Sequence, residues 1–230
     1  MQLGGWHKTT LLDFPGKVAS LVFTQGCNFH CPYCHNPQLV RGEATPLQPE
    51  SVLATLQQRR RLLQGVVISG GEPTLQDDLA DFIRQIRLLG LAVKLDTNGS
   101  QPQVLERLLA ASLLDYVAMD IKSMPGGYPE ELCPAPHNAA IPESLALLRA
   151  SDVSHEFRMT CVSPFITESN FLPILAHLPK NSPIFLQQAR LDTGVLNPAY
   201  MADTGRPLPV VTLGALEAYG KTAGYDCRLR

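Results

Sequence analysis

The alternation of short apolar segments with longer amphipathic segments constrains the fold of this chain more than any other feature. The apolar segments are rich in β-branched residues, and several are continuously apolar, as strands buried on both faces are. They span residues 18–24, 66–69, 91–96, 116–121, 156–162 and 184–188. Helical patterns fall between them, at about 49–63, 79–89, 102–111, 142–150 and 168–177. A strand followed by a helix every 25–35 residues, roughly, predicts an α/β protein with a parallel sheet.

Six such units can form an open doubly wound sheet or a partly closed barrel, and both place the active site at the C-terminal ends of the strands. The 230 residues contain no linker, low-complexity tract or repeat, so we expect a single domain over residues 1–230. The segment 123–140 contains four prolines and follows a predicted strand. We therefore expect a long loop on the active-site face, where loops are often functional.

Composition excludes several classes of protein. Lys and Arg number 19 against 21 Asp and Glu, and 45% of the residues are hydrophobic. This balance excludes the polycationic surface of a general nucleic-acid binder, and so much apolar material argues against disorder. No apolar run is long enough to span a bilayer, and the first residues lack a secretory pattern. We expect a cytoplasmic protein without nucleic-acid or membrane partners.

Three of the six cysteines lie close together in QGCNFHCPYCHNP, directly after a predicted strand. Cys27, Cys31 and Cys34 follow the spacing CxxxCxxC, whereas the other three are isolated. This clustering favours a metal or redox group over a disulfide framework. Thiolates suit iron–sulfur clusters and zinc. His35 could complete a Cys₃His zinc site, whereas a 4Fe–4S cluster on three cysteines keeps one iron open to an external ligand. The spacing alone leaves both open.

The segment ISGGEPTL follows the next predicted strand. Gly70 and Gly71 would let a ligand approach the backbone closely, and Glu72 could accept hydrogen bonds from an ammonium group. The same residues also suit an ordinary strand-to-helix turn, with Pro73 at the first helical position. Downstream of a metal-binding loop, we favour the ligand site.

Two further strand ends carry polar side chains. In KLDTNG, Asp96 closes a strand and is followed by Asn98-Gly99, a common turn dipeptide. In AMDIKS, Asp120 and Lys122 lie two apart on an apolar strand, so their side chains share a face. A solvated strand end is one explanation for them. Because an unpaired buried charge is costly, a mutual pair or a ligand is the other.

The cysteine loop, in which Tyr33 supplies an aromatic residue before the last cysteine, resembles that of the radical S-adenosylmethionine (SAM) superfamily. The order DFPG, FTQGC, CPYCHN is similar to the opening of glycyl-radical-enzyme activating enzymes. GGWHKTTLLDFPG is most similar to the activating proteins of anaerobic ribonucleoside-triphosphate reductase. The similarity is dense over residues 4–37 and continues in short motifs to about residue 122. It implies a partial (β/α)₆ TIM-like barrel with the cluster loop after its first strand.

The resemblance also implies a chemistry. Cys27, Cys31 and Cys34 would hold a single 4Fe–4S cluster whose open iron binds the amino and carboxylate groups of SAM. One electron, from flavodoxin or ferredoxin, would cleave the sulfonium and give a 5′-deoxyadenosyl radical. That radical would take hydrogen from a glycine of a partner glycyl radical enzyme, expected to be the anaerobic ribonucleotide reductase. The cofactor supplies the chemistry, and the protein binds, orients and shields it.

The resemblance further implies which residues form the site. Contacts to SAM are implied for Tyr33, Asn36, Gly70, Gly71, Glu72, Thr97, Asn98, Asp120 and Arg158. Gly70 to Glu72 would receive the methionine amine. Lys122, which we count with the cysteines as a catalytic candidate, would lie near the sulfonium and ribose with Thr97 and Asn98. Arg158 would meet the cofactor carboxylate or pair with a protein carboxylate, and Asp96 and Asp120 would hold a monovalent cation. Where related activases carry a histidine, this chain has Gln187 and Gln188, of which alternation allows one to face inwards.

Two alternative functions stay open at this stage. One is a radical SAM enzyme acting on a small molecule, such as a deazapurine synthase, which needs a pocket rather than a groove for a protein. The loop 123–140 could close over either. The other is a zinc-stabilised binding module without catalysis, with His35 as the fourth ligand; it leaves the strand-end motifs unexplained.

Overall fold

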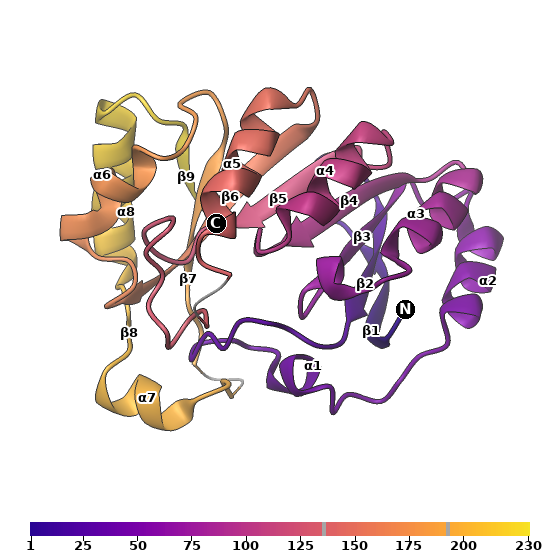
Figure 1. The fold of residues 1–230 in the computed structure, drawn as a ribbon, viewed down its shortest axis with the longest axis horizontal. Coiled ribbons are helices and arrows are strands. Elements are labelled where there is room, and N and C mark those ends of the chain that lie inside the picture. The colour runs from indigo at the N-terminus through magenta and orange to yellow at the C-terminus, as the bar shows by residue number, and fades with distance from the viewer. Residues whose placement is uncertain (135–136, 192–193) are drawn as a thin grey trace. The chain divides into compact units, whose positions relative to one another are not determined.

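The computed structural model describes residues 1–134, 137–191 and 194–230 (Figure 1). The chain divides into two compact units. Unit 1 comprises Met1–Asn28, Gln38–Thr97 and Gln103–Val117, and unit 2 comprises Phe29–Pro37, Asn98–Pro102 and Ala118–Arg230. Residues 135–136, in the long loop expected from the sequence, lie outside the described residues. The single domain expected from the sequence stays a prediction.

Unit 1 is built on a four-stranded arrangement. Its strands are β1 (Leu3–Thr10), β2 (Ala19–Thr24), β3 (Gly65–Gly70) and β4 (Ala92–Thr97). β1 is antiparallel to β2, whereas β2, β3 and β4 are parallel and lie side by side (Figure 1). Val22, Ile68 and Leu95 follow one another across the register and are fully buried. Their continuous burial explains why these strands read as unbroken apolar runs.

Helices and one short turn connect these strands. They are α1 (Pro37–Arg41), α2 (Pro49–Arg59), the 3₁₀ turn η1 (Pro73–Leu75), α3 (Leu79–Leu88) and α4 (Pro102–Ala110). In α3 the buried residues Leu79, Phe82, Ile83 and Ile86 share one face, as the sequence pattern predicts. Gly90, at a φ of +78°, follows the end of this helix, where a left-handed conformation favours glycine.

The strand β5 (Tyr116–Asp120) passes from unit 1 into unit 2. Before its start, the N–H of Asp115 donates to the carbonyl of Val93 in unit 1. After its end, the N–H of Ile121 donates to the carbonyl of Arg158 in unit 2. Each end of β5 is therefore hydrogen-bonded within its own unit.

Unit 2 continues the strand and helix alternation. Its elements are α5 (Ala140–Ala150), β6 (Ser154–Ser163), α6 (Glu168–Leu175), β7 (Ile184–Gln188), α7 (Pro198–Asp203), β8 (Arg206–Pro207), α8 (Val210–Thr222) and β9 (Cys227–Leu229). β7 pairs in parallel with β6 and with β9, and β8 is antiparallel to β6. Thr167 begins α6 with a capping box, in which its side chain and that of Asn170 each accept a backbone N–H.

The six strands predicted from the sequence are all present, and the α/β class is confirmed. The structure adds the edge strand β1, the short strands β8 and β9, and the helices α1, α7 and α8. The cysteine loop consequently follows the second strand, not the first. Over the described ranges, helices are too short or too polar to traverse a lipid bilayer.

Candidate active site

The GGEP turn of unit 1 is fixed to the backbone that leads into the cysteine segment. The N–H of Gly71 donates to the carbonyl of Thr24 at 2.9 Å, and the N–H of Glu72 donates to that of Gly26 at 2.8 Å. A Cβ on Gly71 would lie 1.9 Å from the Gly26 oxygen. Gly70, at a φ of +122°, would place a Cβ 2.3 Å from the Thr24 nitrogen. Both glycines are therefore required by the close packing of this turn against the backbone of residues 24 and 26. This requirement is separate from the predicted contact with a ligand.

Glu72 and Thr97, predicted from two different strand ends, meet in unit 1. The Glu72 side chain is fully buried. Its Oε1 atom accepts hydrogen bonds from the Thr74 backbone N–H at 3.1 Å, the Thr74 hydroxyl at 2.5 Å and the Thr97 hydroxyl at 2.7 Å. These donors satisfy a carboxylate that burial alone would disfavour. They also hold it in one orientation, as an acceptor for a cationic ligand group must be held.

Asp96 lies in an ion pair that the sequence analysis missed. The Lys94 ammonium donates to Asp96 Oδ1, and the two side chains are only 1% and 10% exposed. The same ammonium lies 5.9 Å from the centre of the Tyr116 ring, which is a cation–π distance. The sequence does contain a signal for this ion pair, because Lys94 and Asp96 are two residues apart on one strand and so share a face. For Asp120 and Lys122 the same argument leaves a mutual pair or a ligand open, and the structure shows the pair.

In unit 2, Asp120 lies between two cations. Arg158 Nε donates to Asp120 Oδ1 at 2.8 Å, and Lys122 Nζ donates to Oδ2 at 3.2 Å. Burial alone would raise the pKa of Asp120, but the charges of Arg158 and then Lys122 outweigh it and lower the pKa to about 2. Burial likewise opposes the charge on Lys122, yet Asp120 and then Cys31 raise its pKa well above the usual value. The group carries two positive charges and one negative.

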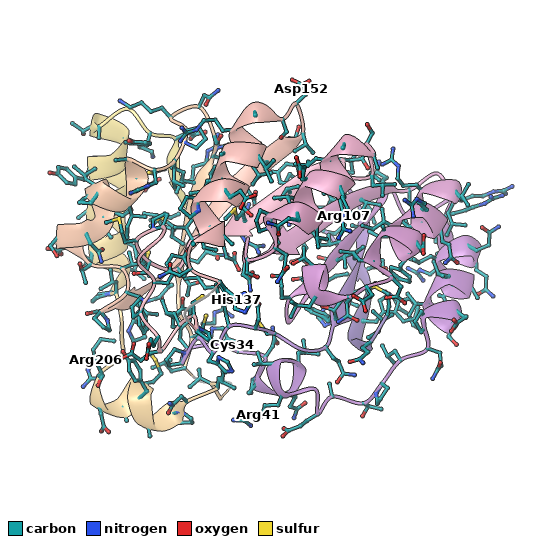
Figure 2. All side chains as sticks on the ribbon, in the orientation of Figure 1. Cys34, Arg41, Arg107, His137, Asp152 and Arg206 are labelled. Carbon is teal, nitrogen blue, oxygen red and sulfur yellow. The ribbon has the colours of Figure 1, made fainter. Side chains whose placement is uncertain are left out.

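Two of the three clustered cysteines, with the aromatic residue between them, lie in unit 2. Cys31 is buried and Cys34, labelled in Figure 2, is half-buried. Burial raises the pKa of Cys31 to about 11, and Lys122 is the largest opposing influence. The Tyr33 hydroxyl is buried and has no hydrogen-bond partner among the described residues. This hydroxyl can therefore form a hydrogen bond with a bound group or a water molecule.

The loop after β5 packs on this cysteine segment. The N–H of Lys122 donates to the Tyr128 hydroxyl at 3.0 Å, and the Tyr128 ring meets the Phe29 ring edge to face at 6.0 Å. The N–H of His30 donates to the carbonyl of Leu132 at 3.0 Å. Tyr128 and Leu132 are buried. The described part of the predicted long loop therefore packs against Phe29 and His30 of the cysteine segment.

A second segment, after β7, holds the cysteine segment by its backbone. The N–H of Leu196 donates to the carbonyl of Cys34 at 3.0 Å, and the N–H of Arg190 donates to His35 Nε2 at 3.3 Å. That ring nitrogen of His35 is thus engaged with the protein, which disfavours it as the fourth ligand of a zinc site.

The remaining predicted residues have structural or peripheral positions. Asn98 is buried, and its Oδ1 accepts from the Ser100 N–H at 2.9 Å, as in an Asx turn. Asn36 is exposed. Gln187 is half-buried and Gln188 is exposed; that one of the two faces inwards stays a prediction.

The donor chemistry of these residues fits a 4Fe–4S cluster with SAM. Three thiols on one segment are soft ligands for iron, Glu72 is a fixed acceptor, and the Tyr33 hydroxyl is unmatched. Cys27 belongs to unit 1, and Cys31 and Cys34 belong to unit 2. Within the ranges described, no three His, Cys, Asp or Glu side chains form a ready-made site for a metal ion.

Comparison with known proteins gives a family match over most of the chain. The model of the Radical SAM superfamily matches residues 21–178. Among solved structures, a radical SAM methyltransferase from Sphaerobacter thermophilus superposes with a TM-score of 0.70 at 16% identity, covering 96% of this chain and 68% of that one. At this identity the likeness concerns the fold alone. The partial barrel of radical SAM type predicted from the sequence is confirmed.

Curated relatives match over shorter stretches. A Methanocaldococcus jannaschii protein provisionally assigned as a glycyl-radical enzyme activating enzyme is 39% identical over 112 residues, 48% of this chain and 46% of the relative. The pyruvate formate-lyase-activating enzyme of Listeria monocytogenes is 31% identical over 124 residues, 49% of this chain and 50% of its own. A provisionally assigned GTP 3′,8-cyclase of Pyrococcus abyssi is 33% identical over 118 residues, which cover 50% of this chain and 38% of the relative. The chain spans half or less of the length of these relatives.

Proposed function

Because the chain belongs to the radical SAM superfamily, we propose that it is an activating enzyme that generates a glycyl radical on a partner protein. When bound, a 4Fe–4S cluster with SAM would supply a 5′-deoxyadenosyl radical able to remove hydrogen from a glycine Cα. The similarity to two relatives named as activating enzymes of glycyl radical enzymes carries this assignment. The opening motifs around DFPG and CPYCHN support it.

The proposal gives each predicted residue a role. Cys27, Cys31 and Cys34 would hold the cluster, and the GGEP turn would receive the methionine amine through Glu72 and exposed carbonyls. Thr97, Asn98 and Lys122 would lie near the ribose and sulfonium, and Tyr33 and Asn36 would complete the surroundings. Asp120 would orient Arg158, which already donates to it through Nε.

Shielding is the second task of the chain's own residues. A carbon radical reacts with any accessible hydrogen donor and with oxygen, so the site must exclude solvent. The contacts of Tyr128 with Phe29 and of Leu132 with His30 support this role for the loop after β5. We propose the anaerobic ribonucleotide reductase as the partner and flavodoxin or ferredoxin as the electron donor, in the cytoplasm.

The decisive experiment combines the reconstituted chain, SAM and a reductant without oxygen, with and without purified anaerobic ribonucleotide reductase. Electron paramagnetic resonance should show a glycyl doublet only when both proteins and SAM are present, together with 5′-deoxyadenosine. The Cys34→Ala variant should give neither signal. Cleavage of SAM without any glycyl doublet on this or another glycyl radical enzyme would contradict the activating function.

A small-molecule radical enzyme is the second candidate, because the GTP 3′,8-cyclase relative matches over a similar share of the chain. The same assay, run with GTP in place of the partner protein, separates the two. Consumption of GTP that depends on SAM and on the three cysteines would favour this candidate. Unchanged GTP together with a glycyl doublet would exclude it.

A further inference from the structure

The monovalent cation implied by the resemblance does not fit the carboxylates that were expected to bind it. A cation site needs oxygen ligands with negative charge to spare. Asp96 already accepts from the Lys94 ammonium, and Asp120 already accepts from Arg158 and Lys122. Each carboxylate thus already has at least one cationic partner, which offsets the negative charge that a further cation would need. Neither would attract a further cation.

The Lys94 side chain is buried and paired with Asp96. It is 1% exposed, on a strand whose neighbouring residues Val93 and Leu95 are fully buried. An ammonium taken out of water at such a position persists only with a charged partner, and Asp96 is that partner. The Tyr116 ring adds a second favourable contact at 5.9 Å.

We infer that the Lys94 ammonium takes the place of a monovalent cation at Asp96. Lys94 is then a positioning residue, which fixes the Asp96 carboxylate at the end of β4, directly before Thr97 and its hydrogen bond to Glu72. The ion pair itself stands independently of what the protein does. Its consequence for SAM rests on the proposed function.

The first test measures stability and needs no activity. We compare the thermal unfolding midpoint of the cluster-free protein in sodium, potassium and tetramethylammonium chloride at equal ionic strength. The wild type should give the same midpoint in all three salts. Lys94→Ala removes the ammonium and its stem, so potassium or sodium should raise its midpoint by at least about 2 °C over tetramethylammonium.

A matched control and a second variant keep the result interpretable. Lys221→Ala also removes a lysine from an ion pair, but the Lys221 side chain is 55% exposed, so no salt-specific shift is expected. If Lys94→Ala does not fold, Lys94→Met/Asp96→Asn removes both charges at similar volume. It should fold without any preference among the salts, since a buried pair can be replaced by neutral groups at little cost. A wild-type midpoint that rises in sodium or potassium alone would overturn the inference.

The second test follows SAM cleavage in the same salts. Wild-type rates should agree between potassium and tetramethylammonium, whereas Lys94→Ala should be about 5-fold or more faster in potassium. A wild type that needs an alkali cation for cleavage would overturn the inference. If the reconstituted wild type cleaves no SAM in any salt, the proposed function fails, and the stability measurement still decides the role of Lys94.

Discussion

At the scale of single residues, Asp120 is a carboxylate whose pKa is set by two neighbouring cations. Its pKa of about 2 lies below the ordinary value because Arg158 and Lys122 outweigh the effect of burial. A folded-state pKa below the unfolded one contributes stability above pH 4, approximately, and loses it as the pH falls towards 2. Because the side chain is 30% exposed, solvent screening reduces the contribution to about 1–2 kcal/mol.

Asp120→Asn should therefore lower the free energy of unfolding at pH 6, with a smaller difference from wild type at pH 3. Urea unfolding at the two pH values measures both differences. Asp81→Asn is the control, because Asp81 forms an exposed pair with Arg84 and should change stability by less than about 0.5 kcal/mol. An Asp120→Asn effect that is equal at pH 3 and pH 6 would contradict the assigned pKa.

The same residues show how far sequence reasoning reaches. Strand alternation predicts that Asp120 and Lys122 share a face and leaves a mutual pair or a ligand open; the structure ends β5 at Asp120 and shows the pair. Lys94 and Asp96 follow the same rule, but the prediction considered only the carboxylate. The contact of Arg158 with Asp120 joins residues 38 apart in the chain, and no periodicity encodes it. Local geometry can be predicted from the sequence, whereas the third partner requires the packed structure.

At the scale of elements, the turn after β3 depends on Gly71. We predict that Gly71→Ala lowers the free energy of unfolding by about 3 kcal/mol or more, because its Cβ would lie 1.9 Å from the Gly26 oxygen. Backbone must move to relieve this contact. Since Gly26 directly precedes Cys27, the iron content after reconstitution should fall as well. Urea unfolding and iron analysis measure the two effects.

Gly214→Ala provides the matched control. Gly214 lies within α8, and a Cβ there meets nothing within 4 Å. Alanine favours a helix interior over glycine by up to about 1 kcal/mol, so this variant should be as stable as wild type or more so. If Gly71→Ala unfolded at the same urea concentration as Gly214→Ala, the close contact between the GGEP turn and β2 would be wrong.

The strands β6, β7 and β9 are joined by Arg230. Its guanidinium donates to both oxygens of Glu156, at 2.8 and 3.3 Å, and lies 3.6 Å from the centre of the Phe185 ring. Glu156 is 1% exposed, so removing this cation leaves a buried carboxylate with less compensation. Arg230→Met should cost about 2 kcal/mol in urea unfolding.

Arg228→Met tests whether that cost is specific. Arg228 pairs with Asp226 at the surface, and such pairs contribute about 1 kcal/mol at most. We expect the Arg228 variant to lose less than half as much stability as the Arg230 variant. Equal losses would mean that the pair with buried Glu156 contributes no more to stability than the surface pair.

Elements differ in how well their sequences identify them. The central strands were predicted because burial on both faces gives continuous apolar runs. β1 escaped prediction because it is an edge strand of mixed burial, in which Gly, Trp, His and Lys follow one another. β9 has three residues and exists through its pairing with β7. Short and edge strands depend on tertiary partners, which sequence periodicity does not report.

For the molecule as a whole, cysteine chemistry sets the number of clusters. Cys133, Cys161 and Cys227 are buried, and burial raises their pKa values to about 11, about 12 and about 11. The pKa of Cys31 is raised to the same range, so burial does not separate these thiols from the cluster ligands; their isolation in the sequence does, because they lack the close spacing of Cys27, Cys31 and Cys34. Only the segment with Cys27, Cys31 and Cys34 then supplies ligands, which is enough for one cluster.

We therefore predict about four iron and four sulfide per chain after anaerobic reconstitution. Cys161→Ala and Cys227→Ala should keep this content, whereas Cys27→Ala, Cys31→Ala or Cys34→Ala should each lose iron and abolish SAM cleavage. Metal analysis and 5′-deoxyadenosine measurement check both statements. One zinc per chain and a colourless protein would instead match a binding module, and about eight iron would require ligands from the buried thiols. Either outcome would contradict an open iron held by three cysteines, on which the activating function depends.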